Sequence, residues 1–155
     1  MILITGGLGF IGLNTAEALL NLGETCILTR NHAVRIPSFV EAELGKRIFI
    51  EPLDISDKDA FLALGTRHRI TGIIHLAASG AGLHDRSAEG LFENLRVNHA
   101  GFLNVLQAAH AWGVRRVCVA STIGVYGGVS APFREDMLLS MDGFHPIPAV
   151  KKRRR

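Results

Sequence analysis

A chain of 155 residues, 48% hydrophobic and 20% charged, has the size and composition of one globular domain, which excludes a disordered protein. Its net charge of +3 depends on the last five residues, all lysine or arginine. Removing these five from the 17 basic side chains leaves 12 against 14 acidic ones. The body of the chain therefore lacks the basic surface of a nucleic-acid-binding protein, and no apolar run reaches the roughly 20 residues that span a bilayer.

Short apolar runs rich in β-branched residues alternate with segments of helical period along the chain. In chain order, the sequence predicts strands at 1–5, 25–30, 47–52, 71–78 and 115–122, and helices at 10–23, 38–45, 56–65 and 87–113. This alternation predicts an α/β fold with a doubly wound parallel sheet of about five strands, in the order 3-2-1-4-5. Ligands of such sheets bind beyond the carboxyl ends of the strands.

Three of the predicted helices carry more specific expectations about their caps and buried sides. Ser56 is expected to cap the helix at 56–65, since serine is a preferred residue at a helix start. The helical period places Ile11, Ala18, Leu19 and Leu22 on one side of the first helix, the pattern of a helix that faces a core. Along one side of the long last helix it places Leu91, Leu95, Phe102, Leu106 and Ala109.

The first strand and helix are joined by TGGLGFIG (5–12), in which Gly6, Gly9 and Gly12 recur at every third position. Glycine permits a tight turn with positive φ, a close approach of bare backbone to a pyrophosphate, and close packing of helix on strand. The N–H groups at the helix start favour an anion. The loop therefore predicts a dinucleotide site; the alternative is a glycine turn with a structural role alone.

The second strand ends in Thr29 and Arg30, where a dinucleotide-binding fold usually carries an acidic residue for the ribose 2′-hydroxyl. A guanidinium at Arg30 can pair with a 2′-phosphate, which an acidic side chain would repel. The sequence therefore favours NADP over NAD as the cofactor. The alternative is that Arg30 is an ordinary solvated residue at a strand end.

Four further motifs follow predicted strands or lie on the long helix: LDISD (53–57), HLAA (75–78), VNHAGFLNVL (97–106) and ASTIGVYGG (120–128). With TGGLGFIG, in this order and spacing, they resemble the extended short-chain dehydrogenase/reductase superfamily, in its NAD-dependent epimerase/dehydratase branch. Familiar members of that branch are nucleotide-sugar epimerases and dehydratases. The resemblance covers the chain up to about residue 151 and implies an NAD(P)-binding Rossmann fold.

The resemblance implies cofactor contacts beyond the glycine loop. It assigns the pyrophosphate to the backbone of Phe10 and Ile11, the adenine amino group to Asp54 with Ile55 beside it, and the adenosine and ribose to Leu76, Ala77 and Ala78. It also implies that Asn98 holds the end of the fourth strand or a proton-relay water. The alternatives are that Asp54 caps a turn and that Asn98 is a satisfied core amide.

The chemistry implied by the resemblance is hydride transfer to or from nicotinamide, with proton transfer by a tyrosine whose pKa a lysine four residues later lowers. Thr122 matches the residue that positions the substrate hydroxyl and is preferred over its neighbour Ser121. Lys151 matches the lysine that also holds the nicotinamide ribose. Ile147 occupies the tyrosine position. Tyr126, the only tyrosine, belongs to a turn that normally accompanies the catalytic tyrosine, and is the alternative acid/base.

Two functional hypotheses follow. The first is an NAD(P)-dependent oxidoreductase or isomerase of the epimerase/dehydratase type, acting on a small nucleotide-sugar-like substrate. The second is a non-catalytic NAD(P)-binding module or a truncated, inactive family member. In both, residues 1–146 are expected to form the Rossmann domain and residues 147–155 the start of the catalytic-helix segment, with the basic KKRRR as its first turns and the substrate domain absent.

The remaining expectations concern the cell and the partners. Cys26 and Cys118 lie in apolar runs, and the N-terminus lacks a secretory signal, so we expect two buried, reduced thiols in a cytoplasmic protein. The helix at 87–113 is typical of elements through which family dimers pack, so we expect a homo-oligomer. Neither nucleic acid, nor a membrane, nor a metal ion is expected as a partner.

Overall fold

The computed structural model describes residues 1–32, 35–80, 87–126 and 132–138, and in this part of the chain five strands form one sheet in the order β3-β2-β1-β4-β5. Every pairing in it is parallel. The α/β class, the doubly wound parallel sheet and the predicted strand order are confirmed. The strands are β1 (Ile2–Thr5), β2 (Cys26–Arg30), β3 (Ile48–Pro52), β4 (Gly72–His75) and β5 (Val117–Val119).

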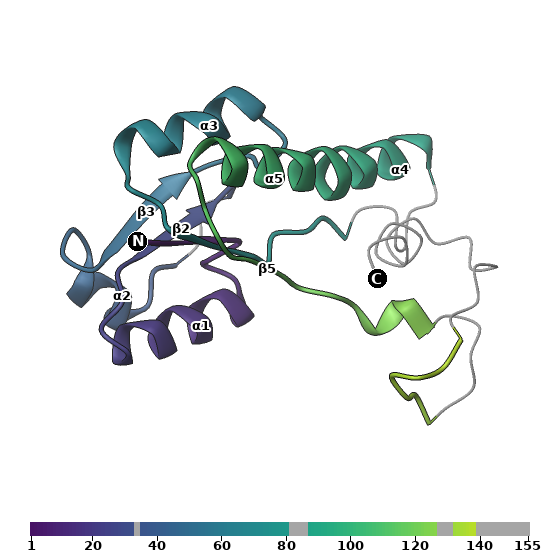
Figure 1. Cartoon of the computed structure of the whole chain (residues 1–155), viewed down its shortest axis with the longest axis horizontal. Coiled ribbons are helices and arrows are strands. Elements are labelled where there is room, and N and C mark those ends of the chain that lie inside the picture. Colours follow the sequence, from purple (N-terminus) through teal and green to yellow (C-terminus); the bar gives the residue numbers. More distant parts are fainter. Residues whose placement is uncertain (33–34, 81–86, 127–131, 139–155) are drawn as a thin grey trace. The chain divides into compact units, whose positions relative to one another are not determined.

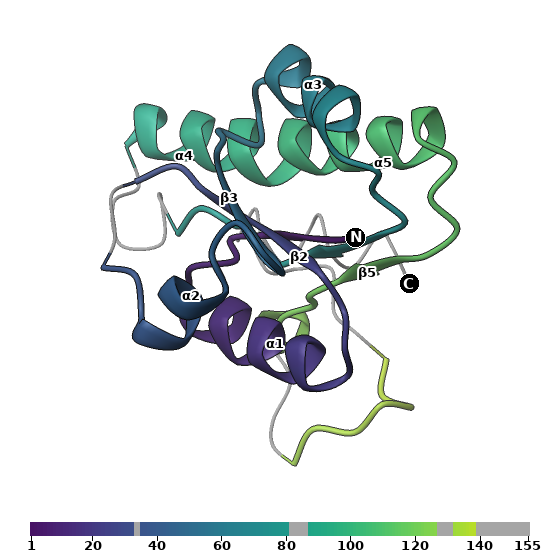
Figure 2. The ribbon, with the colours of Figure 1, turned by 90° about the vertical axis from the view of Figure 1, so that its left-hand side faces the viewer.

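Helices connect the strands and cover the sheet on two sides. Figure 1 shows α1 and α2 on one face of the sheet and α3 and α5 on the other, and the rotated view in Figure 2 shows the same layering. The helices in the described residues are α1 (Phe10–Asn21), α2 (Ser38–Glu43), α3 (Lys58–Arg67), α4 (Ala88–Leu95), the π-helical turn η1 (Arg96–Ala100), α5 (Gly101–Ala111) and the 3₁₀ helix η2 (Ile123–Tyr126).

The described residues fall into two compact units. The first comprises residues 1–78 and 100–120 and contains the sheet with α1, α2, α3 and α5. The second comprises the described parts of 79–99 and 121–138 and contains α4 and η2. The boundary that the sequence predicts at residue 146 lies outside the described residues.

The core of the first unit is built on its central strands. Leu3 and Ile4 on β1 and Ile27 and Leu28 on β2 have no exposed surface. Consecutive residues of a strand point to opposite faces of the sheet, so burial of both neighbours means that both faces are covered. This is the arrangement that the unbroken apolar runs in the sequence indicate.

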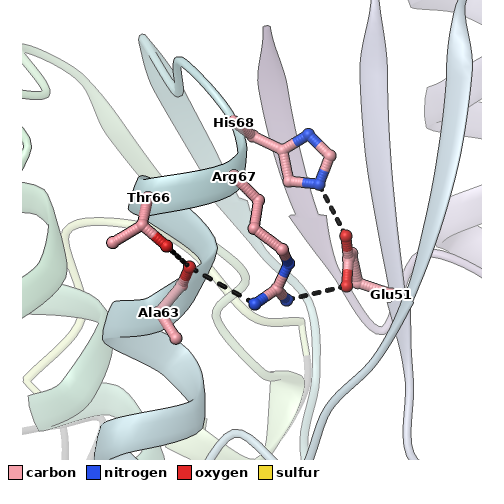
Figure 3. Close-up of polar contacts among 5 residues, drawn as sticks. All are labelled: Glu51, Ala63, Thr66, Arg67 and His68. Atoms are coloured by element: carbon pink, nitrogen blue, oxygen red, sulfur yellow. Dashed lines mark hydrogen bonds and ion pairs between the residues drawn. The ribbon is translucent and has the colours of Figure 1, made fainter.

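The contact of β3 with the end of α3 is polar (Figure 3). Glu51 on β3 accepts a hydrogen bond from Arg67 at 2.8 Å and lies 2.6 Å from Nε2 of His68, and its side chain is only 17% exposed. Burial opposes ionisation of Glu51, but the hydrogen bonds from Arg67 and His68 outweigh it and lower the pKa of the carboxyl group. The end of α3 is therefore tied to the sheet by a partly buried charge cluster.

The buried side of α1 differs from the prediction. Gly12, Ala16 and Leu20 are buried, whereas Ile11 is 61% and Leu22 is 77% exposed. Gly12 lets the start of the helix contact the glycine loop, Ala16 one turn later lies in the core, and these close contacts set the face that turns inward. The predicted side is therefore wrong for Ile11, Ala18 and Leu22, whereas Leu19 is partly buried against the core.

The predicted long helix at 87–113 is three segments. The π-helical turn η1 separates α4 from α5, and the extra residue in such a turn shifts the helical phase by about 100°. The expectation for Ala109 is correct and the expectation for the leucines is wrong, since all three are between 37% and 43% exposed. The buried positions are instead mostly small or amide-bearing: Asn94, Val97, Gly101, Asn104, Val105, Ala108 and Ala109.

Two smaller expectations are also corrected. The N-cap of α3 is Asp57, whose carboxylate accepts a hydrogen bond from the N–H of Ala60 at 3.0 Å; Ser56 lies one residue before this cap. Cys118 is exposed, not buried, because β5 is the outermost strand of the described sheet. Cys26, on the interior strand β2, is buried as predicted.

Candidate functional site

The turn after β1 has no room for a Cβ at three of its glycines, Gly6, Gly7 and Gly12. Gly6 has a positive φ of 67°, and a Cβ there would lie 3.0 Å from the backbone of Ala77 at the end of β4. A Cβ on Gly12 would lie 2.5 Å from the carbonyl oxygen of Gly6 and 2.7 Å from Gly7. Both obstacles are backbone atoms and cannot swing away, so α1 starts in direct contact with the loop.

The amino end of α1 has no cap of its own. Gly9 is the N-cap residue and provides no side-chain hydrogen bond, and the first turn contains no acidic residue. The side chains of Phe10 and Ile11 are 85% and 61% exposed and leave the turn open. Backbone N–H groups and the positive end of the helix dipole are therefore available to an anion, and the arrangement fits a pyrophosphate.

The glycine loop is also hydrogen-bonded to the end of β2. The N–H of Gly6 donates to the hydroxyl of Thr29 at 3.3 Å, and the N–H of Gly7 donates to the carbonyl of Thr29 at 3.1 Å. Arg30 follows directly. One of its terminal nitrogens donates to the carbonyl of His32 at 3.4 Å, and its buried Nε has no hydrogen-bond partner among the described residues.

The ends of β1 and β4 are joined by a polar side-chain contact. Thr5 and His75 are register partners, and the Thr5 hydroxyl lies 2.7 Å from Nδ1 of His75. The same hydroxyl accepts hydrogen bonds from the N–H groups of Leu76 and Ala77, each at 3.2 Å. Both of these residues are half-buried and Ala78 is exposed, so the predicted adenosine segment is fixed at one end and open at the other.

The segment after β3 forms a tight turn around Asp54. One carboxylate oxygen of Asp54 accepts hydrogen bonds from the N–H and the hydroxyl of Ser56, at 2.9 and 2.7 Å. Asp54 therefore does stabilise a turn, the alternative left open by the sequence, and its contact with adenine stays a prediction. Ile55 is 4% exposed, and its carbonyl accepts a hydrogen bond from Asn104 on α5 at 2.9 Å.

In the second unit, Asn98 lies within the π-helical turn, and its side chain forms hydrogen bonds with the backbone of Ser79. Its side-chain oxygen accepts from the Ser79 N–H at 2.9 Å, and its amide donates to the Ser79 carbonyl at 3.0 Å. The amide also donates to Asn94 at 3.1 Å. Asn98 is thus a satisfied amide that holds the chain just past β4; its part in a proton relay stays a prediction.

The residues with predicted catalytic roles are only partly described. Thr122 directly precedes η2, and its hydroxyl oxygen accepts a hydrogen bond from the N–H of Gly124 at 3.2 Å, while Ser121 is exposed. The ring of Tyr126 stacks on Phe133 with centroids 4.9 Å apart. The two catalytic-helix positions, Ile147 and Lys151, lie outside the described residues.

Several polar residues that support the site were not singled out from the sequence. Thr5, Thr29 and His75 are buried and lie at or next to the last residue of three adjacent strands. A polar residue that closes an apolar run is a usable signal, because buried polar groups need partners and the carboxyl ends of parallel strands meet at one edge. Asn104 carries the weaker signal of one amide in an apolar helix.

In the described part of the chain, no helix combines the length and the hydropathy that crossing a membrane requires. Among the same residues, no three histidine, cysteine, aspartate or glutamate side chains gather closely enough to hold a metal ion.

Comparison with known proteins places this arrangement in a family. Residues 2–146 match the model of the NAD dependent epimerase/dehydratase family. A UDP-N-acetyl-alpha-D-glucosaminuronate decarboxylase from Bacillus cytotoxicus is 38% identical over 86% of this chain and 40% of its own length. A UDP-glucuronate 4-epimerase from Thermodesulfobacterium geofontis is 32% identical over 97% of this chain and 47% of its own. The chain thus spans less than half the length of these relatives.

Solved structures give the same result. The UDP-glucose 4-epimerase of Thermus thermophilus in complex with NAD is 29% identical, with a TM-score of 0.78 over 98% of this chain and 47% of that one. The enzyme from Bifidobacterium longum in complex with NAD⁺ and UDP is 26% identical, with a TM-score of 0.76 over 96% of this chain and 44% of that one. Since the family model covers nearly all of the sequence, the chain belongs to the NAD-dependent epimerase/dehydratase family.

Proposed function

We propose that the chain binds a nicotinamide dinucleotide at the carboxyl ends of β1, β2, β3 and β4, as the cofactor-binding portion of an enzyme acting on a nucleotide sugar. The observation that carries this proposal is the amino end of α1, which packs against a glycine loop and has no cap of its own. When bound, the cofactor supplies a nicotinamide ring that accepts or returns a hydride.

The residues of the first unit have separate parts in holding the cofactor. Gly6, Gly9 and Gly12 shape the phosphate turn, in which the backbone of Phe10 and Ile11 meets the pyrophosphate. Asp54 accepts a hydrogen bond from the adenine amino group beside Ile55, and Leu76, Ala77 and Ala78 lie against the adenosine and ribose. In the second unit, Asn98 fixes the chain that follows this segment. Lys151 is assigned to the nicotinamide ribose.

The choice between NAD and NADP is open to a direct test. The Thermus thermophilus and Bifidobacterium longum relatives are complexes with NAD or NAD⁺, which supports NAD here. Arg30, with a buried nitrogen that lacks a partner among the described residues, supports a 2′-phosphate and hence NADP. We propose NAD as the cofactor, and NADP, which Arg30 favours, is the alternative that the titration below distinguishes from it.

For the chemistry, we assign Thr122 to the substrate hydroxyl and Lys151 to lowering the pKa of a proton donor. Ile147 cannot transfer a proton, so the tyrosine-dependent step lacks its usual group. This absence favours the second candidate function, a cofactor-binding module without turnover of its own. The proposed substrates of the first candidate are UDP sugars, because the relatives act on UDP-glucose, UDP-glucuronate and UDP-N-acetylglucosaminuronate.

Assembly is proposed from exposed apolar side chains. On α5 of the first unit, Leu103 and Leu106 are 63% and 43% exposed, and on α4 of the second unit, Phe92 is 72% exposed. Exposed apolar side chains favour self-association, and we propose a homo-oligomer that forms through these helices. Light scattering on a size-exclusion column measures the mass directly, and a single peak at 16.8 kDa would contradict the proposal.

The deciding experiment titrates the protein with NADH and NADPH and follows the fluorescence of the reduced nicotinamide. Binding of either cofactor supports the site, and binding of neither at millimolar concentration contradicts it. If Arg30 contacts a 2′-phosphate, Arg30→Ala should weaken the binding of NADPH and leave the binding of NADH unchanged. Arg116→Ala, an exposed arginine ahead of β5 and at the opposite end of the sheet, is the control.

Turnover separates the two candidate functions. If the protein with bound cofactor converts a UDP sugar, and the rate falls in the Thr122→Ala variant, the chain is an enzyme. Tight cofactor binding without conversion of any of the three UDP sugars, and without gain from Ile147→Tyr, establishes the binding module.

A further inference from the structure

The loop that carries Asp54 is anchored to α5 by two contacts one helical turn apart. Asn104 is 8% exposed, and its side-chain amide donates to the carbonyl oxygen of Ile55 at 2.9 Å. Gly101, one turn earlier, faces the side chain of Ile55, and a Cβ at Gly101 would lie 2.6 Å from its Cδ1. The helix therefore holds Ile55 by its main chain and by its side chain at once.

Within the first unit, the same loop is bonded to the end of β2 at its start and closed by a turn of its own. The N–H of Leu53 donates to the carbonyl of Arg30 at 2.8 Å, and the N–H of Asp57 donates to the carbonyl of Asp54 at 3.0 Å. Ser56 adds two hydrogen bonds to one carboxylate oxygen of Asp54. With these bonds in place, the orientation of the Asp54 carboxylate depends on where the backbone of Ile55 is held.

A carboxylate distinguishes purines by the polarity of position 6. Adenine presents an amino group there, which can donate to Asp54, whereas hypoxanthine presents a carbonyl oxygen, which a carboxylate repels. Such discrimination requires the carboxylate to be fixed, because a mobile one turns away from the wrong base at little cost.

We propose that Asn104 and Gly101 are positioning residues that make the cofactor site selective for adenine. They act through Ile55, which they hold in one place, and so fix the adjoining Asp54 against the base. The inference rests on the proposed function, in which Asp54 meets the adenine amino group. It adds two residues of α5 to that site and names the selectivity that they supply.

A purely structural role for Asn104 makes a different prediction. Loss of a buried hydrogen bond lowers stability and can weaken every ligand alike, but it leaves the ratio of two affinities unchanged. The ratio of dissociation constants for NADH and its reduced hypoxanthine analogue is therefore the informative measurement, since the two differ only in the base. Both fluoresce through the same nicotinamide.

The variant is Asn104→Leu, which keeps the size of the side chain and removes the donor. The control is Gln107→Leu, the same chemical change one turn later at an exposed position of α5. We expect the unaltered protein to favour NADH by about tenfold or more, the value of one good hydrogen bond plus one avoided repulsion. Asn104→Leu should reduce this ratio by at least about threefold, and Gln107→Leu should leave it unchanged.

Gly101→Ala serves where Asn104→Leu does not fold. Alanine favours the helix, so α5 is retained, while the new methyl group displaces Ile55 and should reduce the same ratio. If the unaltered protein binds NADH but does not discriminate, or if both variants keep the full ratio, this inference is overturned and the cofactor site stands. If the unaltered protein binds neither dinucleotide, the proposed function fails and this inference with it.

Discussion

The hydroxyl of Thr5 lies 2.7 Å from Nδ1 of His75, across the boundary between β1 and β4. That hydroxyl already accepts from two backbone N–H groups, at Leu76 and Ala77, so its single proton is directed to the imidazole. Nδ1 of His75 is then the acceptor in this contact. One buried hydroxyl thus joins two strands and the start of the next segment.

This network predicts that Thr5→Val destabilises the protein. The change keeps the shape of the side chain but leaves buried partners without their hydrogen bonds, which should cost about 1–3 kcal/mol of unfolding free energy. Urea unfolding followed by circular dichroism measures the loss. Thr71→Val is the matched control, because the Thr71 hydroxyl also links the two strands, through Met1, but at their exposed opposite end. Equal losses in the two variants would contradict the assignment.

Two glycines of the phosphate turn should respond differently to alanine. The Cβ of Gly12→Ala meets the backbone of two loop residues, Gly6 and Gly7, so we expect a loss of about 1–3 kcal/mol in stability. Gly9 has φ of −77°, which alanine adopts without strain, and its Cβ would meet only the Gly6 carbonyl at 3.2 Å. Gly9→Ala should therefore stay folded and weaken cofactor binding. Thermal unfolding with and without NADH separates the two effects, and the reverse order of stability would refute this account.

The contact of Glu51 with Arg67 and His68 predicts a pH dependence of stability. Because the folded state lowers the pKa of Glu51 below 4.5, its contribution is fully present above that pH and is lost as acid protonates the carboxylate. Glu51→Gln should reduce stability at pH 7 by up to about 1 kcal/mol and make the decline between pH 5 and about pH 3 shallower. Unfolding free energies across this range test it, and parallel curves for the two proteins would count against the cluster.

The two cysteines should differ in reactivity. Burial, chiefly, raises the pKa of Cys26 to about 11, so almost no thiolate forms at neutral pH. Cys118 is exposed on β5. Iodoacetamide added to the folded protein at pH 8 should alkylate Cys118 and leave Cys26 unmodified, as peptide mass spectrometry would show. The denatured protein, in which both should react, is the control.

The sequence predicted the features that depend on local pattern. Apolar runs rich in β-branched residues located all five strands, and the handedness rule for parallel crossovers then determined their order. The glycine spacing of 5–12 located the turn, because positive φ at Gly6 and close contact at Gly12 exclude other side chains.

Features that depend on contacts between distant segments were not predictable in this way. The buried face of α1 follows from the contact of Gly12 with the glycine loop and of Ala16 with the core. The π-helical turn at 96–100 breaks the helical period that placed Leu91, Leu95 and Leu106 on one side. The hydrogen bonds of Thr5 with His75 and of Asn104 with Ile55 join residues 70 and 49 positions apart. Their existence required the register of the sheet and the position of α5.

The bare start of α1 has a thermodynamic consequence. Its geometry is set by backbone contact with the glycine loop, so the cap that most helices take from their own sequence is left for a ligand to provide. A dinucleotide that binds there only in the folded state raises the melting temperature as its concentration rises. At a concentration one hundred times its dissociation constant, it adds about 2.7 kcal/mol to the free energy of unfolding. Inorganic pyrophosphate, which carries the same anion without the nucleosides, should reproduce part of that shift.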